Sequence, residues 1–270
     1  MLFRLGYNGR MAIPRLDEIE ALARGAGEIL REGFGQAQKV THKGVIDLVT
    51  EYDERSEQYL MEKIANDFQG HKVMAEESGG REGDGECLWI VDPLDGTVNY
   101  AHGLPIFSVS LAFAVKGQVV MGVVYDPMRD ECFTAEKGKG AWMNGDQLQV
   151  GGRERLGESL LVTGFPYDAR ENADNNLDHF AHMALRSMGV RRLGSAALDL
   201  CYIAAGRFDG YWEIRLEAWD IAGGGLIVRE AGGTATNLQG KSDYLKPPYS
   251  IAAANEKVHA EMLKELNRKS

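Results

Sequence analysis

Two carboxylates follow directly on a short apolar run of the sequence. Residues 87–91 are rich in aromatic and β-branched types, as in a strand buried on both faces, and Asp92 and Asp95 come next. Pro93 restricts the backbone between them, and Gly96 permits a close backbone approach. Like charges held so close are costly unless a cation lies between them, and Mg²⁺ prefers oxygen ligands. The segment therefore indicates a divalent metal site, with an Asp-Pro turn bearing solvated acids as the simpler alternative.

Other acids occupy comparable positions, and each also has a purely structural explanation. Glu76 and Glu77 end a predicted strand and enter a glycine-rich stretch that is typical of a surface turn. Asp53 follows Thr50 by three residues, as in a capping box, and Asp220 is expected to open a helix as its N-cap. If these acids shared one cleft, they could hold two or more Mg²⁺ ions that clamp a phosphate and activate water.

The composition is that of an acidic globular protein. The chain has 270 residues, of which 44% are hydrophobic and 26% charged, enough for one large domain or two closely packed lobes. Forty acidic residues against 30 lysines and arginines give a formal net charge of −10, which disfavours binding to nucleic acid or to an anionic membrane. Bound cations would reverse the local potential and permit a phosphate ligand despite this charge.

The sequence predicts neither secretion nor membrane insertion. Residues 1–11 lack the apolar core of a signal peptide, and no apolar run approaches membrane-spanning length. Cys87, Cys132 and Cys201 are widely spaced, lie in apolar surroundings and lack metal-ligand spacing. They are typical of reduced core thiols, so a cytoplasmic location is expected.

The first half of the chain is predicted to place helices on an antiparallel sheet. Apolar residues recur at helical spacing over 14–34, and Thr50 caps a second predicted helix that runs to about Phe68. Strands are expected at 39–49 (a strand or a hairpin), 71–75, 107–115, 119–125, 132–135 and 147–150.

The second half alternates strands and helices, which favours a mixed or parallel sheet covered by helices. Strands are expected at 160–163, 191–193, 208–214 and 250–253, and helices at 177–188, 195–205, 219–230 and 255–267. The predicted organisation is an N-terminal extension at 1–13 and a single domain at 14–270, with lobes at about 14–153 and 154–270.

Three ordered motifs together resemble the inositol monophosphatase family of Mg²⁺-dependent, lithium-sensitive phosphatases. They are Asp92-Pro93-Leu94-Asp95-Gly96-Thr97 followed by Val98-Asn99, the upstream Ala75-Glu76-Glu77-Ser78, and the downstream Trp219-Asp220-Ile221-Ala222-Gly223. The resemblance covers about residues 14 to 268. It implies an α/β (α+β) fold, a layered αβαβα sandwich of the inositol monophosphatase and fructose-1,6-bisphosphatase type, commonly assembled as a homodimer.

The resemblance also implies a role for each candidate residue. Two or three Mg²⁺ ions would be held by Glu76, Asp92, the backbone carbonyl of Leu94, Asp95 and Asp220. Thr97 and Asp53 would orient and activate the attacking water, Glu76 would take part in catalysis as well, and Glu77 would lie near this water or a third, weaker metal ion. The phosphate or the alcohol part of the substrate would contact Asp95, Gly96, Thr97, Gly194, Ser195, Ala196, Glu213 and Asp220.

The expected reaction is hydrolysis of a phosphate monoester by direct attack of a metal-activated water, without a phosphoenzyme. Inositol 1-phosphate is the leading substrate, because the segment 99–105 resembles the inositol phosphatase branch and Glu213 can accept hydrogen bonds from hydroxyls. A fructose-1,6-bisphosphatase or dual-specificity sugar phosphatase is the first alternative, and a regulatory binding protein with low turnover is the second. The loop lysine of the family corresponds to Lys43, or its place is taken by His42.

Overall fold

The structure is a computed structural model that describes residues 12–36, 40–42, 48–83 and 85–268. Most of the predicted extension at 1–13 lies outside the described residues, and so does Lys43. The described residues therefore do not decide between Lys43 and His42 as the loop residue. Within the described ranges, no helix combines the length and the apolar character needed to span a membrane.

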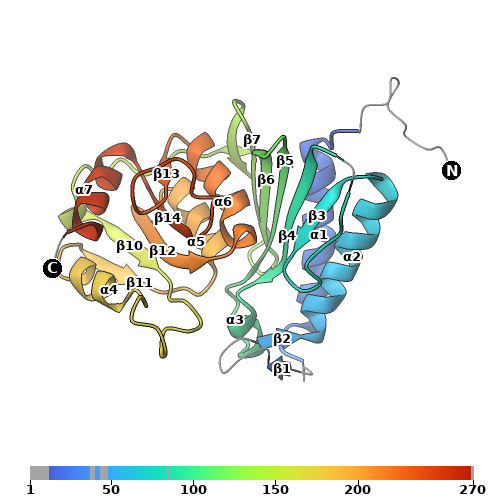
Figure 1. Ribbon diagram of the computed structural model, residues 1–270, viewed down its shortest axis with the longest axis horizontal. Coiled ribbons are helices and arrows are strands. Elements are labelled where there is room, and N and C mark those ends of the chain that lie inside the picture. Colours follow the sequence, from blue (N-terminus) through green and yellow to red (C-terminus); the bar gives the residue numbers. More distant parts are fainter. Residues whose placement is uncertain (1–11, 37–39, 43–47, 84, 269–270) are drawn as a thin grey trace.

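The chain forms five alternating layers of helices and strands, which confirms the predicted αβαβα sandwich (Figure 1). Helices α1 (Leu16–Gly33) and α2 (Glu51–Asp67) cover the outer face of a seven-stranded sheet. Helices α5 (Ala196–Ala204) and α6 (Ala218–Glu230) pack between this sheet and a five-stranded sheet. Helices α4 (Leu177–Ala184) and α7 (Glu256–Leu266) lie on the outer side of the second sheet. In this arrangement, loops that follow strands of the first sheet lie beside loops that follow strands of the second sheet.

The first sheet has the strand order β3-β4-β5-β6-β7-β8-β9. Its strands are β3 (Lys72–Ala75), β4 (Cys87–Asp95), β5 (Ser108–Val115), β6 (Gln118–Asp126), β7 (Glu131–Glu136), β8 (Gly140–Met143) and β9 (Asp146–Gln147). The elements around it are α1 (Leu16–Gly33), the antiparallel pair β1 (Val40–His42) and β2 (Leu48–Thr50), α2 (Glu51–Asp67) and α3 (Thr97–Ala101).

The second sheet has the order β11-β10-β12-β14-β13. Its strands are β10 (Leu160–Thr163), β11 (Gly189–Arg191), β12 (Gly210–Leu216), β13 (Thr234–Thr236) and β14 (Tyr249–Ala254). The helices of this half are η1 (Leu156–Glu158), α4 (Leu177–Ala184), α5 (Ala196–Ala204), α6 (Ala218–Glu230) and α7 (Glu256–Leu266). The predicted division into lobes at about residue 153 stays a prediction, although it falls between the strands of the two sheets.

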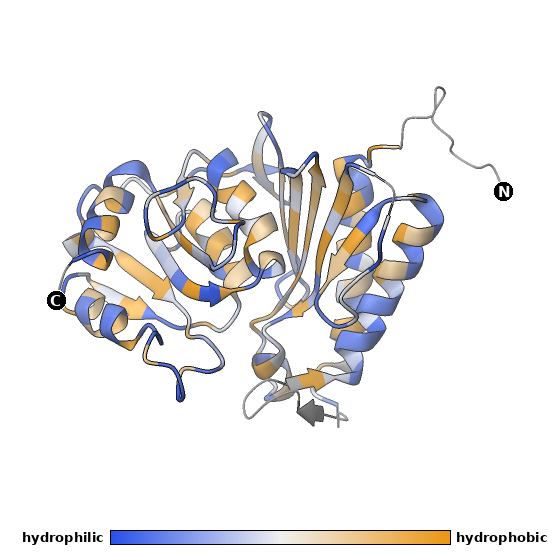
Figure 2. Cartoon of the chain, viewed as in Figure 1, coloured by the Kyte–Doolittle hydropathy of each residue, from blue (hydrophilic) through white to orange (hydrophobic). Residues whose placement is uncertain are grey.

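The central helices are apolar on nearly every side because sheets cover them on both faces. In α5 every residue from Ala197 to Ala204 is buried, Asp199 included. In Figure 2 the central helices and the strands of the first sheet are largely orange, whereas blue surfaces dominate the outer side of α2. The cysteines Cys87, Cys132 and Cys201 are free and buried in these layers, as expected for core thiols.

Helix α6 lies against the first sheet through backbone contacts. A Cβ atom added to Gly122 of β6 would stand 2.7 Å from the carbonyl oxygen of Gly223, and one added to Gly223 would stand 3.2 Å from the carbonyl oxygen of Leu111. Ser110 Oγ also donates a hydrogen bond of 3.2 Å to the Trp219 carbonyl. The first turn of α6 is thereby fixed close to strands β5 and β6.

Several predicted elements differ from the observed ones. The first sheet is not purely antiparallel, because β3 pairs with β4 in parallel, and the alternation of a single strand does not encode the direction of its neighbour. Helix α4 ends at Ala184 rather than at 188, and β11 begins two residues before the predicted strand. The short strands β8 and β13 lie in stretches that the sequence did not predict as strands.

Candidate active site

Strand β4 continues through the predicted metal ligands instead of ending before them. The strand runs to Asp95, with an irregular register against β5 between Asp92 and Asp95. This irregularity delivers both carboxylates and the intervening Leu94 into one cavity. Gly96 then turns the chain into α3 with φ of +97°, and a Cβ there would stand 3.0 Å from the Ile106 carbonyl oxygen. A side chain at this position would therefore be both strained and crowded.

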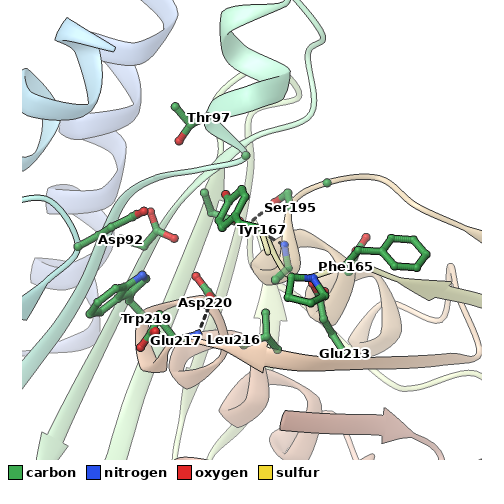
Figure 3. A pocket seen from close by; sticks show the side chains of 18 of the residues that line it. Asp92, Thr97, Phe165, Tyr167, Ser195, Glu213, Leu216, Glu217, Trp219 and Asp220 are labelled. Atoms are coloured by element: carbon green, nitrogen blue, oxygen red, sulfur yellow. Dashed lines mark hydrogen bonds between the residues drawn. The ribbon is translucent and has the colours of Figure 1, made fainter. Parts of the chain in front are cut away.

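The cavity lies between the two sheets and has a volume of about 360 Å³, within the range typical of small-ligand sites. Figure 3 shows Asp92 from β4 and Asp220 from α6 directed into the same space, with Thr97 beyond them and Glu213 on another side. The predicted site residues that line it are Glu76, Asp92, Leu94, Asp95, Gly96, Thr97, Gly194, Ser195, Ala196, Glu213 and Asp220. Asp53 and Glu77 are not part of this lining, but Oδ1 of Asp53 lies 3.0 Å from the Thr97 hydroxyl and Glu77 follows Glu76 in the chain.

The acids of the cavity are close enough to influence one another's ionisation. Burial raises the pKa of Asp92 well above its usual range, and the charges of Glu76, Asp95 and Asp220 raise it further. Burial likewise raises the pKa of Asp220 well above its usual range. Removing these carboxylates from water therefore costs free energy that a bound cation would offset.

Asp95 connects the two halves of the cavity. Its carboxylate accepts hydrogen bonds from the hydroxyl of Ser195 and from the backbone N–H groups of Ala196 (3.2 Å) and Ala197 (2.9 Å) at the start of α5. Burial raises the pKa of Asp95 to about 6, against the opposing effect of these donors. The predicted substrate contacts Ser195 and Ala196 are thus present at the site, but both of them hold Asp95.

Thr97 and Asp53 form the predicted pair. The Thr97 hydroxyl lies 3.0 Å from Oδ1 of Asp53 and 3.0 Å from the carbonyl oxygen of Leu94, and it can donate to either. Asp53 also accepts from the backbone N–H of Thr50 at 2.8 Å, in the capping box of α2. Burial raises the pKa of Asp53 to about 6, whereas the hydrogen bonds from Thr50 and Thr97 lower it. One carboxylate therefore caps a helix and orients Thr97.

Helix α2 holds two site segments with further buried polar groups that the motifs did not single out. Glu57 accepts hydrogen bonds of 2.8 Å from the backbone N–H groups of Glu77 and Ser78, just after Glu76. Ser56 donates a 2.9 Å hydrogen bond to the Pro93 carbonyl between the two acids of β4. Their spacing from Asp53 on one buried helical face is the sequence signal for both residues.

Asp220 is not the N-cap of α6, as the sequence analysis expected. The N-cap is Glu217, and Asp220 is the third helical residue, where its Oδ2 accepts a 2.7 Å hydrogen bond from the backbone N–H of Glu217. Glu213 lies in β12, and its carboxylate accepts a 2.6 Å hydrogen bond from the Tyr211 hydroxyl. Burial raises the pKa of Glu213 to about 7.

The donor chemistry of the cavity fits a hard divalent cation. All the predicted ligands offer oxygen atoms, namely four carboxylates and the carbonyl of Leu94, and their burial penalises the negative charge that they carry. Among the described residues, no three ionisable side chains already stand together as a set of metal ligands. The match between these residues and a divalent cation therefore rests on their oxygen donors and their negative charge.

A sequence model of the inositol monophosphatase family matches residues 14–270 of the chain. The chain belongs to the inositol monophosphatase family. It is 43% identical over 246 residues to an inositol-1-monophosphatase of Mesorhizobium japonicum, covering 90% of this chain and 92% of that protein. It is also 43% identical over 244 residues to the Nus factor SuhB of Pasteurella multocida, covering 89% of this chain and 91% of that one.

A solved structure of the extragenic suppressor protein suhB from Bartonella henselae has the same fold. Its TM-score is 0.88 at 36% sequence identity, and the match covers 93% of this chain and 98% of the other. Membership of the inositol monophosphatase family supports phosphatase activity, and members of the family use Mg²⁺. The names of the relatives differ, so the substrate of this chain is a separate question.

Four charged residues that line the cavity were not among the predicted site residues. They are Arg192, Asp199, Arg215 and Glu217. Arg215 interrupts the otherwise buried strand β12, adopts φ of +57° at a register irregularity, and forms an ion pair with Asp168. A charged residue within a buried strand is the signal that could have identified Arg215. Asp199 lies in a helix whose other buried residues are mostly apolar, so the sequence pattern does not mark it as a site residue.

Replacing Glu213 by glutamine should remove part of the pH dependence of stability. Because burial raises the pKa of Glu213 from 4.5 to about 7, its ionisation destabilises the metal-free fold progressively between these values. Glu213→Gln should thus raise the free energy of unfolding at pH 8 by up to about 3 kcal/mol and change it little at pH 4.5. Urea unfolding in EDTA at both pH values, with the exposed Glu171→Gln as control, measures this. Equal effects at the two pH values would contradict it.

Proposed function

We propose that the protein hydrolyses a phosphate monoester in a Mg²⁺-dependent reaction, with inositol 1-phosphate as the leading substrate. The observation that carries the proposal is the convergence of Asp92 and Asp95 from β4 and of Asp220 from α6 beside the Thr97–Asp53 pair. Membership of the inositol monophosphatase family and the name of the Mesorhizobium japonicum relative support it.

The carboxylates would hold the cofactor and, with it, the phosphate. Glu76, Asp92, Asp95, Asp220 and the carbonyl of Leu94 would bind two or three Mg²⁺ ions. Such ions supply charge stabilisation for the transferred phosphoryl group and lower the pKa of water. The backbone N–H groups of Gly96 and Thr97 would donate hydrogen bonds to phosphate oxygens. Their position beside Asp95 puts these donors next to the carboxylates.

Thr97 and Asp53 would position the attacking water. When the Thr97 hydroxyl donates a hydrogen bond to Asp53, its lone pairs remain free to accept a hydrogen bond from water. With a pKa of about 6, Asp53 is mostly ionised near pH 7 and can take a proton through Thr97. Glu77 follows Glu76 at the same loop and would lie behind this water. No phosphoenzyme is required in this arrangement, because the water attacks phosphorus directly.

Replacing Asp95 by asparagine should lower Mg²⁺-dependent phosphate release by at least about 100-fold, because it removes a proposed metal ligand. The experiment compares phosphate release from inositol 1-phosphate with and without Mg²⁺. Asp178→Asn changes an exposed acid on α4 and serves as the matched control. Circular dichroism and thermal unfolding would establish that Asp95→Asn remains folded. Full activity in the folded Asp95→Asn protein would refute the assigned mechanism.

A panel of phosphate esters tests the substrate. Inositol 1-phosphate should give a higher kcat/KM than fructose 1,6-bisphosphate, because the Glu213 carboxylate accepts hydrogen bonds from hydroxyl groups and repels a second phosphate. The opposite order would identify a fructose-1,6-bisphosphatase or a dual-specificity sugar phosphatase. A regulatory binding protein would release phosphate from no ester of the panel. Each assay is repeated in EDTA to show dependence on the metal.

We further propose that the enzyme is a cytoplasmic homodimer. Its three cysteines are free and buried, which suits a reducing compartment. Leu185 and Met188 are 84% and 65% exposed next to the edge strand β11, so a second copy could cover them. Sedimentation velocity at micromolar concentration should give a dimer, and Leu185→Glu should shift it toward monomer. A monomeric wild-type protein would exclude this assembly.

A further inference from the structure

One acid of the cavity has no part in the chemistry described above. Asp199 lies in the first turn of α5, lines the cavity, and is 1% exposed. Its Oδ1 is buried and has no hydrogen-bond partner among the residues that the structure describes. Leaving a buried polar atom unpaired costs roughly 1–3 kcal/mol, and more for a charged group. The fold therefore maintains an unpaired acceptor at the wall of its ligand cavity.

The charged groups nearest to Asp199 do not pair with this acceptor. The charges that act on Asp199 are those of Glu213, Asp95 and Arg192. Asp95 already accepts hydrogen bonds from the hydroxyl of Ser195 and from the backbone at the start of α5. Glu213 receives one from Tyr211, which leaves its other oxygen for a further donor. Asp199 and Glu213 therefore both offer carboxylate oxygens at the cavity.

Glycines keep room at this part of the cavity. A Cβ on Gly164 would stand 2.2 Å from Oε1 of Glu213, and a Cβ on Gly194 would stand 3.0 Å from Nη1 of Arg192. Both glycines line the cavity together with the two charged side chains. A larger residue at either position would displace the Glu213 carboxylate or the Arg192 guanidinium, so the two glycines leave room for these side chains.

The charge of this part of the cavity selects the kind of ligand group. Two neighbouring carboxyls repel a phosphate, so the phosphate belongs at the cation-binding end and the alcohol part at Asp199 and Glu213. Burial, with the nearby charge of Glu213, raises the pKa of Asp199 well above its usual range. A hydroxyl suits either ionisation state, since it donates to a carboxylate and accepts from a protonated acid. An apolar alcohol would leave Oδ1 unpaired.

We propose that Asp199 is a specificity-determining residue that hydrogen-bonds a hydroxyl of the substrate's alcohol part and, together with Glu213, selects polyhydroxylated phosphate esters. This inference rests on the proposed phosphatase function and names its substrate class. Adjacent hydroxyls of a cyclitol or sugar would pair with the two acids, while Arg192 would contact a hydroxyl oxygen. Esters without hydroxyls would satisfy none of these groups.

The test compares one polyhydroxylated ester with one that lacks hydroxyls. The kcat/KM for inositol 1-phosphate is divided by that for cyclohexyl phosphate, in Mg²⁺, for the wild type, Asp199→Ala and Asp199→Asn. The ratio should fall by roughly 10–100-fold in Asp199→Ala, as expected for a lost hydrogen bond to a charged group. Asp199→Asn keeps an acceptor oxygen, so its ratio should fall less. The exposed Asp178→Ala is the matched control.

The outcomes separate this inference from the proposed function. A wild type that hydrolyses neither ester in Mg²⁺ would overturn the phosphatase function and the inference with it. Hydrolysis of both esters with the same ratio in wild type, Asp199→Ala and Asp199→Asn would overturn the inference alone, because a structural role lowers both rates together. A monodeoxy inositol 1-phosphate that lacks the hydroxyl bound by Asp199 should react more slowly than inositol 1-phosphate with the wild type. With Asp199→Ala the two esters should react at similar rates, because the hydrogen bond is already absent. If the effect of Asp199→Ala and the effect of the missing hydroxyl were additive for every analogue, the inference would also be contradicted.

Discussion

The hydrogen bonds to Asp95 are the interaction on which the site depends. This carboxylate ends a strand of the first sheet, and its donors are Ser195, Ala196 and Ala197, at the start of a helix that packs against both sheets. This junction joins the two walls of the cavity, since one wall comes from β4 and the other from α5 and β12. A lost acceptor would leave buried N–H groups unpaired as well as remove a charge.

Helix capping and the proposed chemistry share the same side chains in this protein. Asp53 in α2 and Asp220 in α6 each occupy the third helical position and accept a hydrogen bond from the backbone of their N-cap residue. A capping box fixes the rotamer of its acid, so the local requirement of the helix also orients a group of the site. The structural and the functional explanations of these acids are therefore compatible.

Local patterns predicted much of the fold, whereas Gly194, Ser195 and Ala196 of the cavity lining were implied only by the family resemblance. Apolar periodicity located α1, and the Thr50 cap located α2, because both signals are local in sequence. Strand direction and the termini of short elements depend on distant partners, which explains the unpredicted parallel pairing of β3 with β4. Asp199 escaped prediction for a similar reason. Its neighbours in sequence are core residues, and its role depends on β12 folding beside α5.

The glycine contact between α6 and β6 makes the end of the cavity that holds Asp220 less tolerant of substitution than the opposite end. Where Gly122 meets Gly223, main chain touches main chain, so no side chain there can be exchanged or repacked to move Asp220. The proposed alcohol end consists of the side chains of Asp199, Glu213 and Arg192, none of which takes part in that contact. A lineage of such proteins could therefore acquire new substrates by single substitutions while its phosphate chemistry stayed fixed.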